Sequence, residues 1–150
     1  MLSPDLCVAG FAAKSSDDVV RALSARLLAA GRVKSSFEGA TLARERRSPT
    51  GLPFPTIAVA MPHAEPEHVV APAIAVASLA APVPFRQMGS PGIRLPVSLV
   101  VMPALTAKEQ AAAELSRLVE LLQDESLRRA LASAASDAAL CELLAPHWRP

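Results

Sequence analysis

The spacing of apolar side chains in the first third of the chain predicts two helices. Apolar residues recur there with helical periodicity at Val19, Val20, Leu23 and Leu27. Ser15 offers a side-chain cap ahead of the acidic residues at 17–18, which suit the positive end of a helix, and Gly31 ends the repeat. A second, shorter helix is expected from Phe37 to about Arg46, because Pro49 disfavours helical geometry before it.

The middle of the chain has a different pattern, in which short apolar runs alternate with prolines and glycines. The runs at 56–61, 73–80 and 96–102 contain few polar residues. Such runs are typical of strands that are covered on both faces. Residues 83–85 are expected to form a short edge strand, and the segment 86–96 is rich in turn residues.

The last third returns to helical spacing and predicts three helices. Thr106 and Glu109 form a capping-box pattern, and Asp124 and Ser136 are expected to cap two shorter helices. The apolar faces consist of Leu115, Leu118, Val119 and Leu122, then Leu127 and Leu131, then Leu140, Leu143 and Leu144. Helices, then strands, then helices predict an α/β fold: a single domain over residues 1–150, with a mixed β-sheet sandwiched between helices and an irregular N-terminal segment at 1–14.

Composition and charge exclude several classes of protein. The formal net charge is +1, so no basic field is available to hold a nucleic acid, and no aromatic residues surround the local cluster of Arg44, Arg46 and Arg47. No run approaches the roughly 20 apolar residues of a membrane span, and the N-terminus does not have the pattern of a signal peptide. The only cysteines, Cys7 and Cys141, are far apart in sequence, so we expect reduced thiols and a cytoplasmic protein.

Residues 58–68 carry the candidate chemistry. His63 follows a buried strand at a turn fixed by Pro62, which places its imidazole at a strand end. If one ring nitrogen were tied to a backbone carbonyl, the other would be left as a nucleophile. From the residues alone three interpretations stay open: loop histidines without chemistry, a metal site made of His63, His68 and a glutamate, or a histidine that accepts a phosphoryl group.

Four stretches of the sequence bear on this choice. They are "LARERRSPTG" at 42–51, "IAVAMPHA" at 57–64, "APAIAVASLAAPVPF" at 71–85 and "LVELLQDESLRRAL" at 118–131. Together they resemble the EIIA domains of the bacterial phosphoenolpyruvate-dependent sugar phosphotransferase system, of the fructose–mannitol type. The spacing of Pro-His-x-Glu-x-x-His resembles most the galactitol-type branch. The resemblance implies a phosphotransferase/anion-transport-protein-like fold.

The resemblance also implies roles for particular residues. His63 matches the histidine that accepts a phosphoryl group on Nε2 from phospho-HPr and passes it to EIIB. Arg44 matches an arginine near that histidine, where a guanidinium suits phosphate oxygens; a cation that only offsets the helix dipole is the alternative. Ala111 stands where mannitol-type members have a second histidine, and His68 is expected to lie beside His63 as a possible neighbour.

The same resemblance implies a phosphocarrier for the uptake of a sugar or sugar alcohol. Its partners would be HPr, EIIB and, through EIIB, the membrane component EIIC, and it would need no cofactor and no metal. The alternative is a regulatory, nitrogen-type EIIA that binds other proteins according to its phosphorylation. We expect an apolar docking patch made of Leu52, Phe54 and Met61.

The two glutamates of this segment have no role assigned by the resemblance. Glu65 and Glu67 should point away from a dianionic phosphate, or else repel it and keep it labile.

Overall fold

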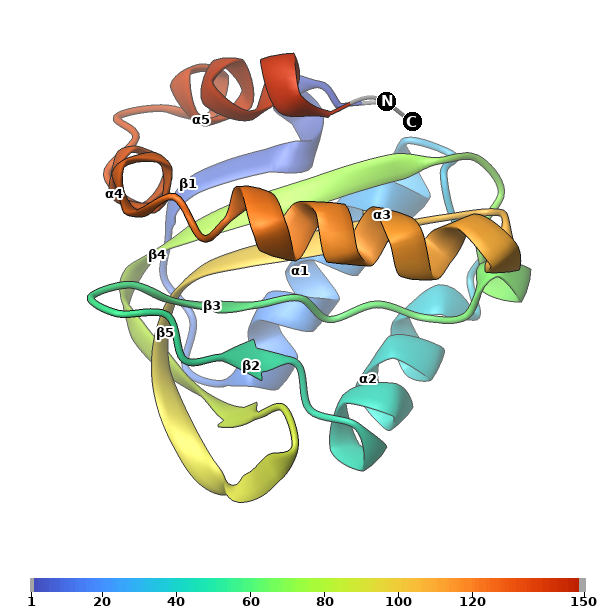
Figure 1. Ribbon diagram of the computed structural model, residues 1–150. Helices are drawn as coiled ribbons and strands as arrows, with labels where there is room; N and C mark the ends of the chain where they lie inside the picture. Colours follow the sequence, from blue (N-terminus) through green and yellow to red (C-terminus); the bar gives the residue numbers. More distant parts are fainter. Residues whose placement is uncertain (1, 149–150) are drawn as a thin grey trace.

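The structure, a computed structural model, describes residues 2–148, in which helices cover both faces of a mixed β-sheet (Figure 1). The strands are β1 (Cys7–Phe11), β2 (Gly51–Leu52), β3 (Ala58–Ala60), β4 (Ala73–Gln87) and β5 (Ser90–Ala104). The helices are α1 (Ser16–Ala29), α2 (Phe37–Arg47), α3 (Lys108–Leu121), α4 (Glu125–Ala132) and α5 (Asp137–Leu144). Short 3₁₀ turns lie at η1 (Pro4–Leu6), η2 (Pro66–His68) and η3 (Ala145–His147).

The sheet is organised around the long hairpin of β4 and β5. These two strands pair antiparallel, and β1 and β3 flank them in parallel orientation on β4 and β5 respectively. Strand β2 pairs antiparallel with β3 and also meets the far end of β4, where Gly51 is in register with Gln87. The sheet therefore bends back on itself, and β3 lies in the bent part between β2 and β5.

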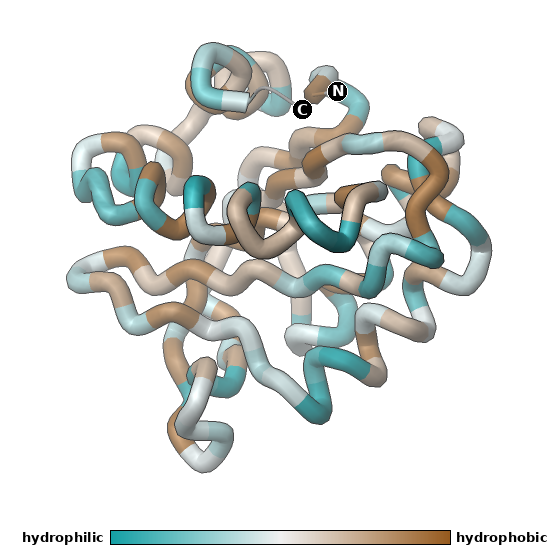
Figure 2. Tube along the Cα trace, turned by 45° about the vertical axis from the view of Figure 1, so that its right-hand side comes forward, coloured by the Kyte–Doolittle hydropathy of each residue, from teal (hydrophilic) through white to brown (hydrophobic). Residues whose placement is uncertain are grey.

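Two apolar cores separate the helices into layers. One core packs α1 and α2 against one face of the sheet, and the other packs α3, α4 and α5 against the opposite face. Hydrophobic residues concentrate along the strands, whereas hydrophilic residues alternate with them along the helices (Figure 2). The predicted α/β sandwich with strands buried on both faces is confirmed.

Most of the predicted helix starts are confirmed, and one is wrong. The side chains of Ser15, Asp124 and Ser136 each accept a hydrogen bond from the backbone three residues on. The capping box at Thr106 does not form, because α3 begins one residue later, with Ala107 as an N-cap that contributes no side-chain bond. The first turn of α3 thus lacks the cap that its sequence suggests.

The strand predictions are wrong where prolines and glycines lie inside the long hairpin. Residues 83–85 are not a separate edge strand, and 86–96 is mostly not a turn: both belong to the outer half of the hairpin, which reverses at Gly89 with φ 75°. Pro84 faces Pro96 in register, so the two missing N–H donors coincide and the strands continue. The expectation of an irregular segment at 1–14 is also wrong, because it contains β1.

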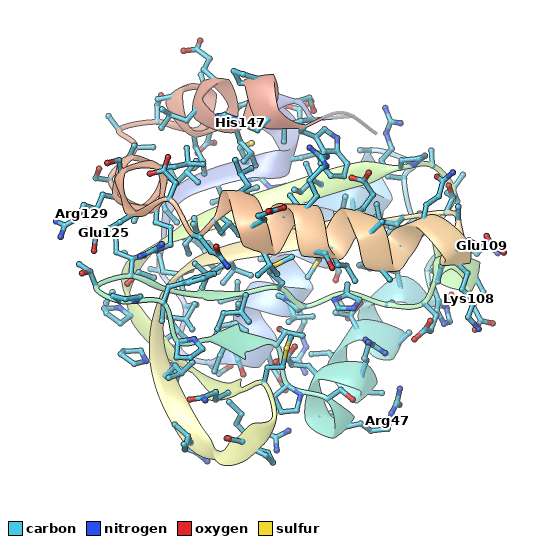
Figure 3. All side chains as sticks on the ribbon, in the orientation of Figure 1. Arg47, Lys108, Glu109, Glu125, Arg129 and His147 are labelled. Atoms are coloured by element: carbon cyan, nitrogen blue, oxygen red, sulfur yellow. The ribbon has the colours of Figure 1, made fainter. Side chains whose placement is uncertain are left out.

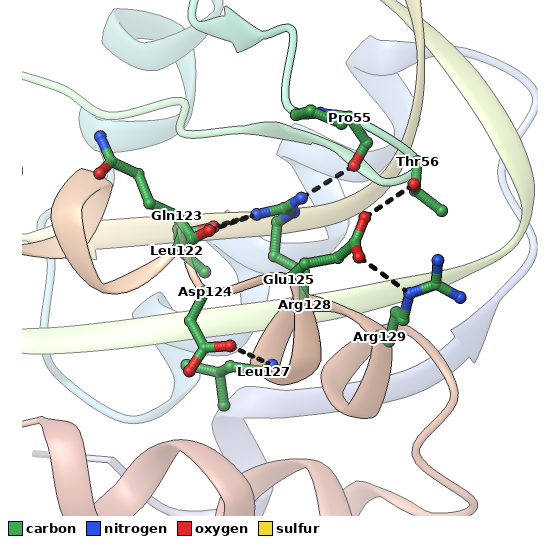
Figure 4. A network of polar contacts seen from close by, with 9 residues as sticks. All are labelled: Pro55, Thr56, Leu122, Gln123, Asp124, Glu125, Leu127, Arg128 and Arg129. Carbon is green, nitrogen blue, oxygen red and sulfur yellow. Dashed lines mark hydrogen bonds and ion pairs between the residues drawn. The ribbon is translucent and has the colours of Figure 1, made fainter.

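A buried arginine fastens α4 to the rest of the molecule (Figure 4). Arg128 is 1% exposed, and its guanidinium donates to the carbonyls of Leu122 and Gln123 at the end of α3 and to that of Pro55. It also stacks over Phe54, with 4.8 Å from the guanidinium carbon to the ring centroid. Helix-end carbonyls thus provide the negative partner for a buried cation.

The two cysteines, far apart in sequence, lie in the same apolar core. Cys7 on β1 and Cys141 on α5 are both buried and free. Burial, reinforced by the neighbouring Cys141, raises the pKa of the Cys7 thiol to about 12.

No helix within residues 2–148 combines the length and the apolar character that crossing a bilayer requires.

Candidate functional site

His63 stands at the end of β3, held by its own backbone. The strand ends at Ala60, and the buried Met61 and Pro62 follow. The ring nitrogen Nδ1 of His63 lies 2.8 Å from the carbonyl oxygen of Met61. A carbonyl only accepts, so Nδ1 carries the proton, and in the neutral ring Nε2 is left with a free lone pair. The contact with a backbone carbonyl that the sequence left as a possibility is therefore present.

The half-buried imidazole opens on a small cavity of about 190 Å³ between the β3 end and α3. Arg44, at the end of α2, and Glu65 line it on the side of His63. Across from them α3 contributes Lys108 and the small side chain of Ala111. The remaining walls are apolar, so the cavity combines a few charged residues with an apolar lining, as small-molecule sites commonly do.

The surroundings keep His63 uncharged at neutral pH. Burial lowers the pKa of the imidazole below its ordinary value, and the positive charge of Arg44 lowers it further. The bond to the Met61 carbonyl and the charge of Glu65 act in the opposite direction, but burial has the largest effect. The ring is therefore a neutral imidazole, which is the nucleophilic form.

Arg44 and Glu65 form an ion pair inside this site. Arg44 Nη1 lies 2.9 Å from Glu65 Oε1, and the arginine side chain is 28% exposed. Its Nε is buried and has no hydrogen-bond partner within the described residues. The expectation that Glu65 points away is wrong, since Glu65 lines the cavity beside His63. Glu67 instead lines an adjacent groove together with Lys108 and Glu109.

A second hydrogen-bond chain supports the residue that holds His63. Thr50 Oγ1 accepts from the backbone N–H of Met61 at 3.1 Å and donates to Glu45 Oε1 at 2.7 Å. The other carboxylate oxygen of Glu45 accepts from the Thr50 N–H at 3.0 Å. Burial raises the pKa of Glu45, and the two bonds from Thr50 counteract that effect. Thus the Arg-Glu-x-x-x-Pro-Thr stretch supplies the two residues that hold the Met61 N–H, a role that the motif alone does not indicate.

His68 is not brought into the cavity. It lies in η2, and its Nδ1 is 2.8 Å from the hydroxyl oxygen of Ser36, before α2. The residues lining the cavity include His63 and Arg44 but not His68. Over the part of the chain that the structure describes, no three His, Cys, Asp or Glu side chains are arranged to hold a metal ion.

The expected docking patch is wrong in two of its three residues. Leu52 and Met61 belong to the buried core, and Phe54 is half-buried beneath Arg128. Leu52 and Met61 lie in the core beneath α3, α4 and α5, a packing that the sequence did not reveal. Conversely, no sequence pattern indicates Lys108, because its place in the cavity wall depends on where α3 crosses the sheet.

A protein-family model matches residues 1–146 of the chain. It describes the phosphoenolpyruvate-dependent sugar phosphotransferase system, EIIA 2. Multiphosphoryl transfer protein 2 of Escherichia coli (strain K12) is 32% identical over 133 residues, which is 87% of this chain. The chain spans only 15% of the length of that curated relative.

Solved structures share the fold. The complex of enzyme IIAMTL with phosphorylated enzyme IIBMTL from Escherichia coli contains a chain that superposes with a TM-score of 0.77 at 23% identity, covering 97% of this chain and 98% of that one. Nitrogen regulatory protein IIA-Ntr from Neisseria meningitidis gives 0.70 at 21% identity, with 95% of each chain covered. At these identities the likeness is one of fold. The comparisons confirm the expected family and do not confirm the galactitol branch.

Proposed function

The chain belongs to the EIIA 2 family of the phosphoenolpyruvate-dependent sugar phosphotransferase system, and from this premise we propose that it carries a phosphoryl group on His63 from phospho-HPr to an EIIB protein. It is thus a phosphotransferase component. The observation that supports His63 most directly is its bond to the Met61 carbonyl, because this bond fixes the proton on Nδ1 and leaves Nε2 as the nucleophile.

In this proposal the transfer uses the imidazole of His63 and the groups that surround it. The lone pair of Nε2 forms a bond to phosphorus while the bond between phosphorus and the donor atom breaks, and that electron pair leaves with the donor. Nδ1 keeps its proton, and the positive charge that develops on the ring is stabilised by the Met61 carbonyl. The reverse sequence, with EIIB as the acceptor, returns the imidazole to its neutral state.

Arg44 is proposed to hold the oxygens of the group in flight. Its guanidinium lines the cavity with His63, and its Nε is buried with no partner among residues 2–148. A planar fork matches phosphoryl oxygens, and phosphoryl transfer depends mainly on positioning and charge stabilisation. In this proposal the phosphoryl group takes over the bond from Arg44 that Glu65 holds in the free protein.

EIIB is proposed as a partner because the fold relative from Escherichia coli is described in complex with phosphorylated enzyme IIB. A regulatory role of the nitrogen type is the second candidate, and the fold shared with IIA-Ntr keeps it in consideration. The two candidates use the same histidine chemistry and differ in the acceptor. Transfer of labelled phosphate from the protein to an EIIB of its own genome would favour the transport role.

The test of His63 uses the fact that the chain has only three histidines, at 63, 68 and 147. The protein is incubated with phosphoenolpyruvate, Enzyme I and HPr, and the acid-labile phosphate is mapped by mass spectrometry. His63→Ala should abolish labelling and leave the circular dichroism spectrum unchanged, whereas His68→Ala and His147→Ala should be labelled like the wild type. Label that survives in His63→Ala would refute the proposal.

A further inference from the structure

We propose that Lys108 is a second cationic ligand of the phosphoryl group on His63, facing Arg44 across the cavity; this inference rests on the proposed function. Lys108 is the first residue of α3, is exposed, and is one of the residues that line the same cavity as His63 and Arg44. Nothing in the sequence marks it, since a lysine at a helix start is usually a solvated surface residue.

The composition of the α3 wall singles out Lys108. Four residues of α3 line the cavity, and the other three are Ala111, Ala112 and Leu115. These follow Lys108 at the three- and four-residue intervals that put side chains on one face of a helix. The small side chains leave the space in front of His63 open and offer it no polar group. Within this wall the lysine is the only charged side chain.

The charge balance of the cavity requires a cation besides Arg44. Arg44 is paired with Glu65 at 2.9 Å, and the imidazole is neutral because burial lowers its pKa. Without Lys108 the site therefore carries no net charge. A phosphoryl group brings a charge of about −1.5 to −2. With Lys108 counted, the cavity carries a net charge of +1 that offsets part of the phosphoryl charge, whereas Arg44 paired with Glu65 offsets none of it.

The position of Lys108 has no evident structural purpose. Among residues 2–148 no ion pair or hydrogen bond involves its ammonium group. A cation at the N-terminus of a helix opposes the helix dipole, so the residue does not stabilise α3. Figure 3 shows Lys108 and Glu109 at that end of the helix. Lys108 also borders the adjacent groove, which Glu65 and Glu67 line. The flexible lysine side chain can turn from this groove to the cavity.

The experiment compares Lys108→Met and Lys108→Arg with Lys14→Met, a matched control at an exposed lysine that does not line the cavity. Each variant is phosphorylated with phospho-HPr and, separately, with phosphoramidate, a small donor that needs no docking surface. The labelling rate is measured with both donors, and the pKa of the phosphoryl group on the labelled protein is measured by ³¹P NMR titration.

We expect Lys108→Met to slow labelling by about tenfold or more with both donors and to raise the phosphoryl pKa by about one unit, because a nearby cation favours the dianion. Lys108→Arg and Lys14→Met should behave like the wild type. A rate loss with phospho-HPr alone would assign Lys108 to docking and overturn the inference, as would an unchanged phosphoryl pKa. A wild-type protein that neither donor labels would instead refute the proposed function, and the inference would fall with it.

Discussion

Replacing Thr50 with valine tests whether the brace behind Met61 supports both the fold and the site. Valine keeps the shape of the side chain and removes the hydroxyl. Two bonds are lost: the one from the Met61 N–H at 3.1 Å and the one to Glu45 Oε1 at 2.7 Å. The Met61 N–H is then left in the core without an acceptor, because Met61 and Thr50 are each 3% exposed.

The expected loss of stability follows from these two bonds. A buried donor left unsatisfied costs about 1–3 kcal/mol, and a hydrogen bond to a charged group contributes roughly 1.5–3 kcal/mol. The two effects overlap, so we expect the free energy of unfolding to fall by about 2–5 kcal/mol. In a domain of this size that corresponds to a Tm lower by roughly 5–15 °C.

The same substitution should slow the labelling of His63. Met61 is held through its N–H, and its carbonyl fixes the imidazole. A Met61 that is free to shift weakens the bond to Nδ1, whose net value is about 0.5–1.5 kcal/mol, and this corresponds to a roughly 2- to 10-fold slower reaction.

Denaturant unfolding and the initial rate of phosphorylation from phospho-HPr measure the two effects. Thr41→Val is the matched control, because Thr41 is equally buried and its hydroxyl donates only to the carbonyl of Phe37 within α2. The control should lose little stability and label at the wild-type rate, and Thr50→Ser should retain much of both properties. Wild-type stability and wild-type labelling in Thr50→Val would show that the hydroxyl supports neither Met61 nor His63.

Three further predictions follow from the geometry of the site and of the sheet. Arg44→Ala should slow phosphoryl transfer by about 10²–10³-fold in a rapid-quench assay. Arg46→Ala should change the rate little, because Arg46 lies outside the cavity. Equal losses in the two variants would mean that the basic cluster only steers partners. Because burial lowers the pKa of His63, its labelling rate should stay level as the pH falls to about 6.5, the ordinary histidine value, and decline only at lower pH. A rate that declines already between pH 7.5 and 6.5 would contradict the lowered pKa of His63. The related contribution of His63 to stability is complete above the unfolded-state pKa and is lost as the pH falls through the lowered one. Gly51→Ala should destabilise the fold by about 1–3 kcal/mol, because its Cβ would lie 2.5 Å from a backbone carbonyl oxygen of β4. Gly39→Ala, inside α2 with open space around its Cβ, should be neutral or stabilising in the same denaturant titration.

Much of the fold follows from local interactions that can be predicted from the sequence. Ser15, Asp124 and Ser136 cap their helices because a short polar side chain can reach the first free N–H groups. The apolar runs became strands buried on both faces for the same kind of reason, since such runs must be removed from water. These are interactions between residues close in sequence, or requirements that any location in a core satisfies.

The presentation of His63 belongs to the same class. Pro62 and the end of an apolar strand predicted a rigid turn at which the ring could be tied to a carbonyl, and the structure has that contact with Met61, two residues away. A contact across so short a stretch of chain is set by local backbone geometry. The resemblance to a known family could also be recognised from the sequence, because the motifs that carry it are short and contiguous.

The rest of the site depends on contacts that no local pattern encodes. Glu65 turns toward Arg44, Lys108 enters the wall opposite His63, and His68 leaves the site for Ser36. Leu52 and Met61 are buried because they pack in the core that the sheet shares with α3, α4 and α5. Each of these outcomes is set by how α2, α3 and the bent sheet pack together. The packing minimises exposed apolar area over the whole chain, and the side chains near His63 take the positions that this global arrangement leaves to them.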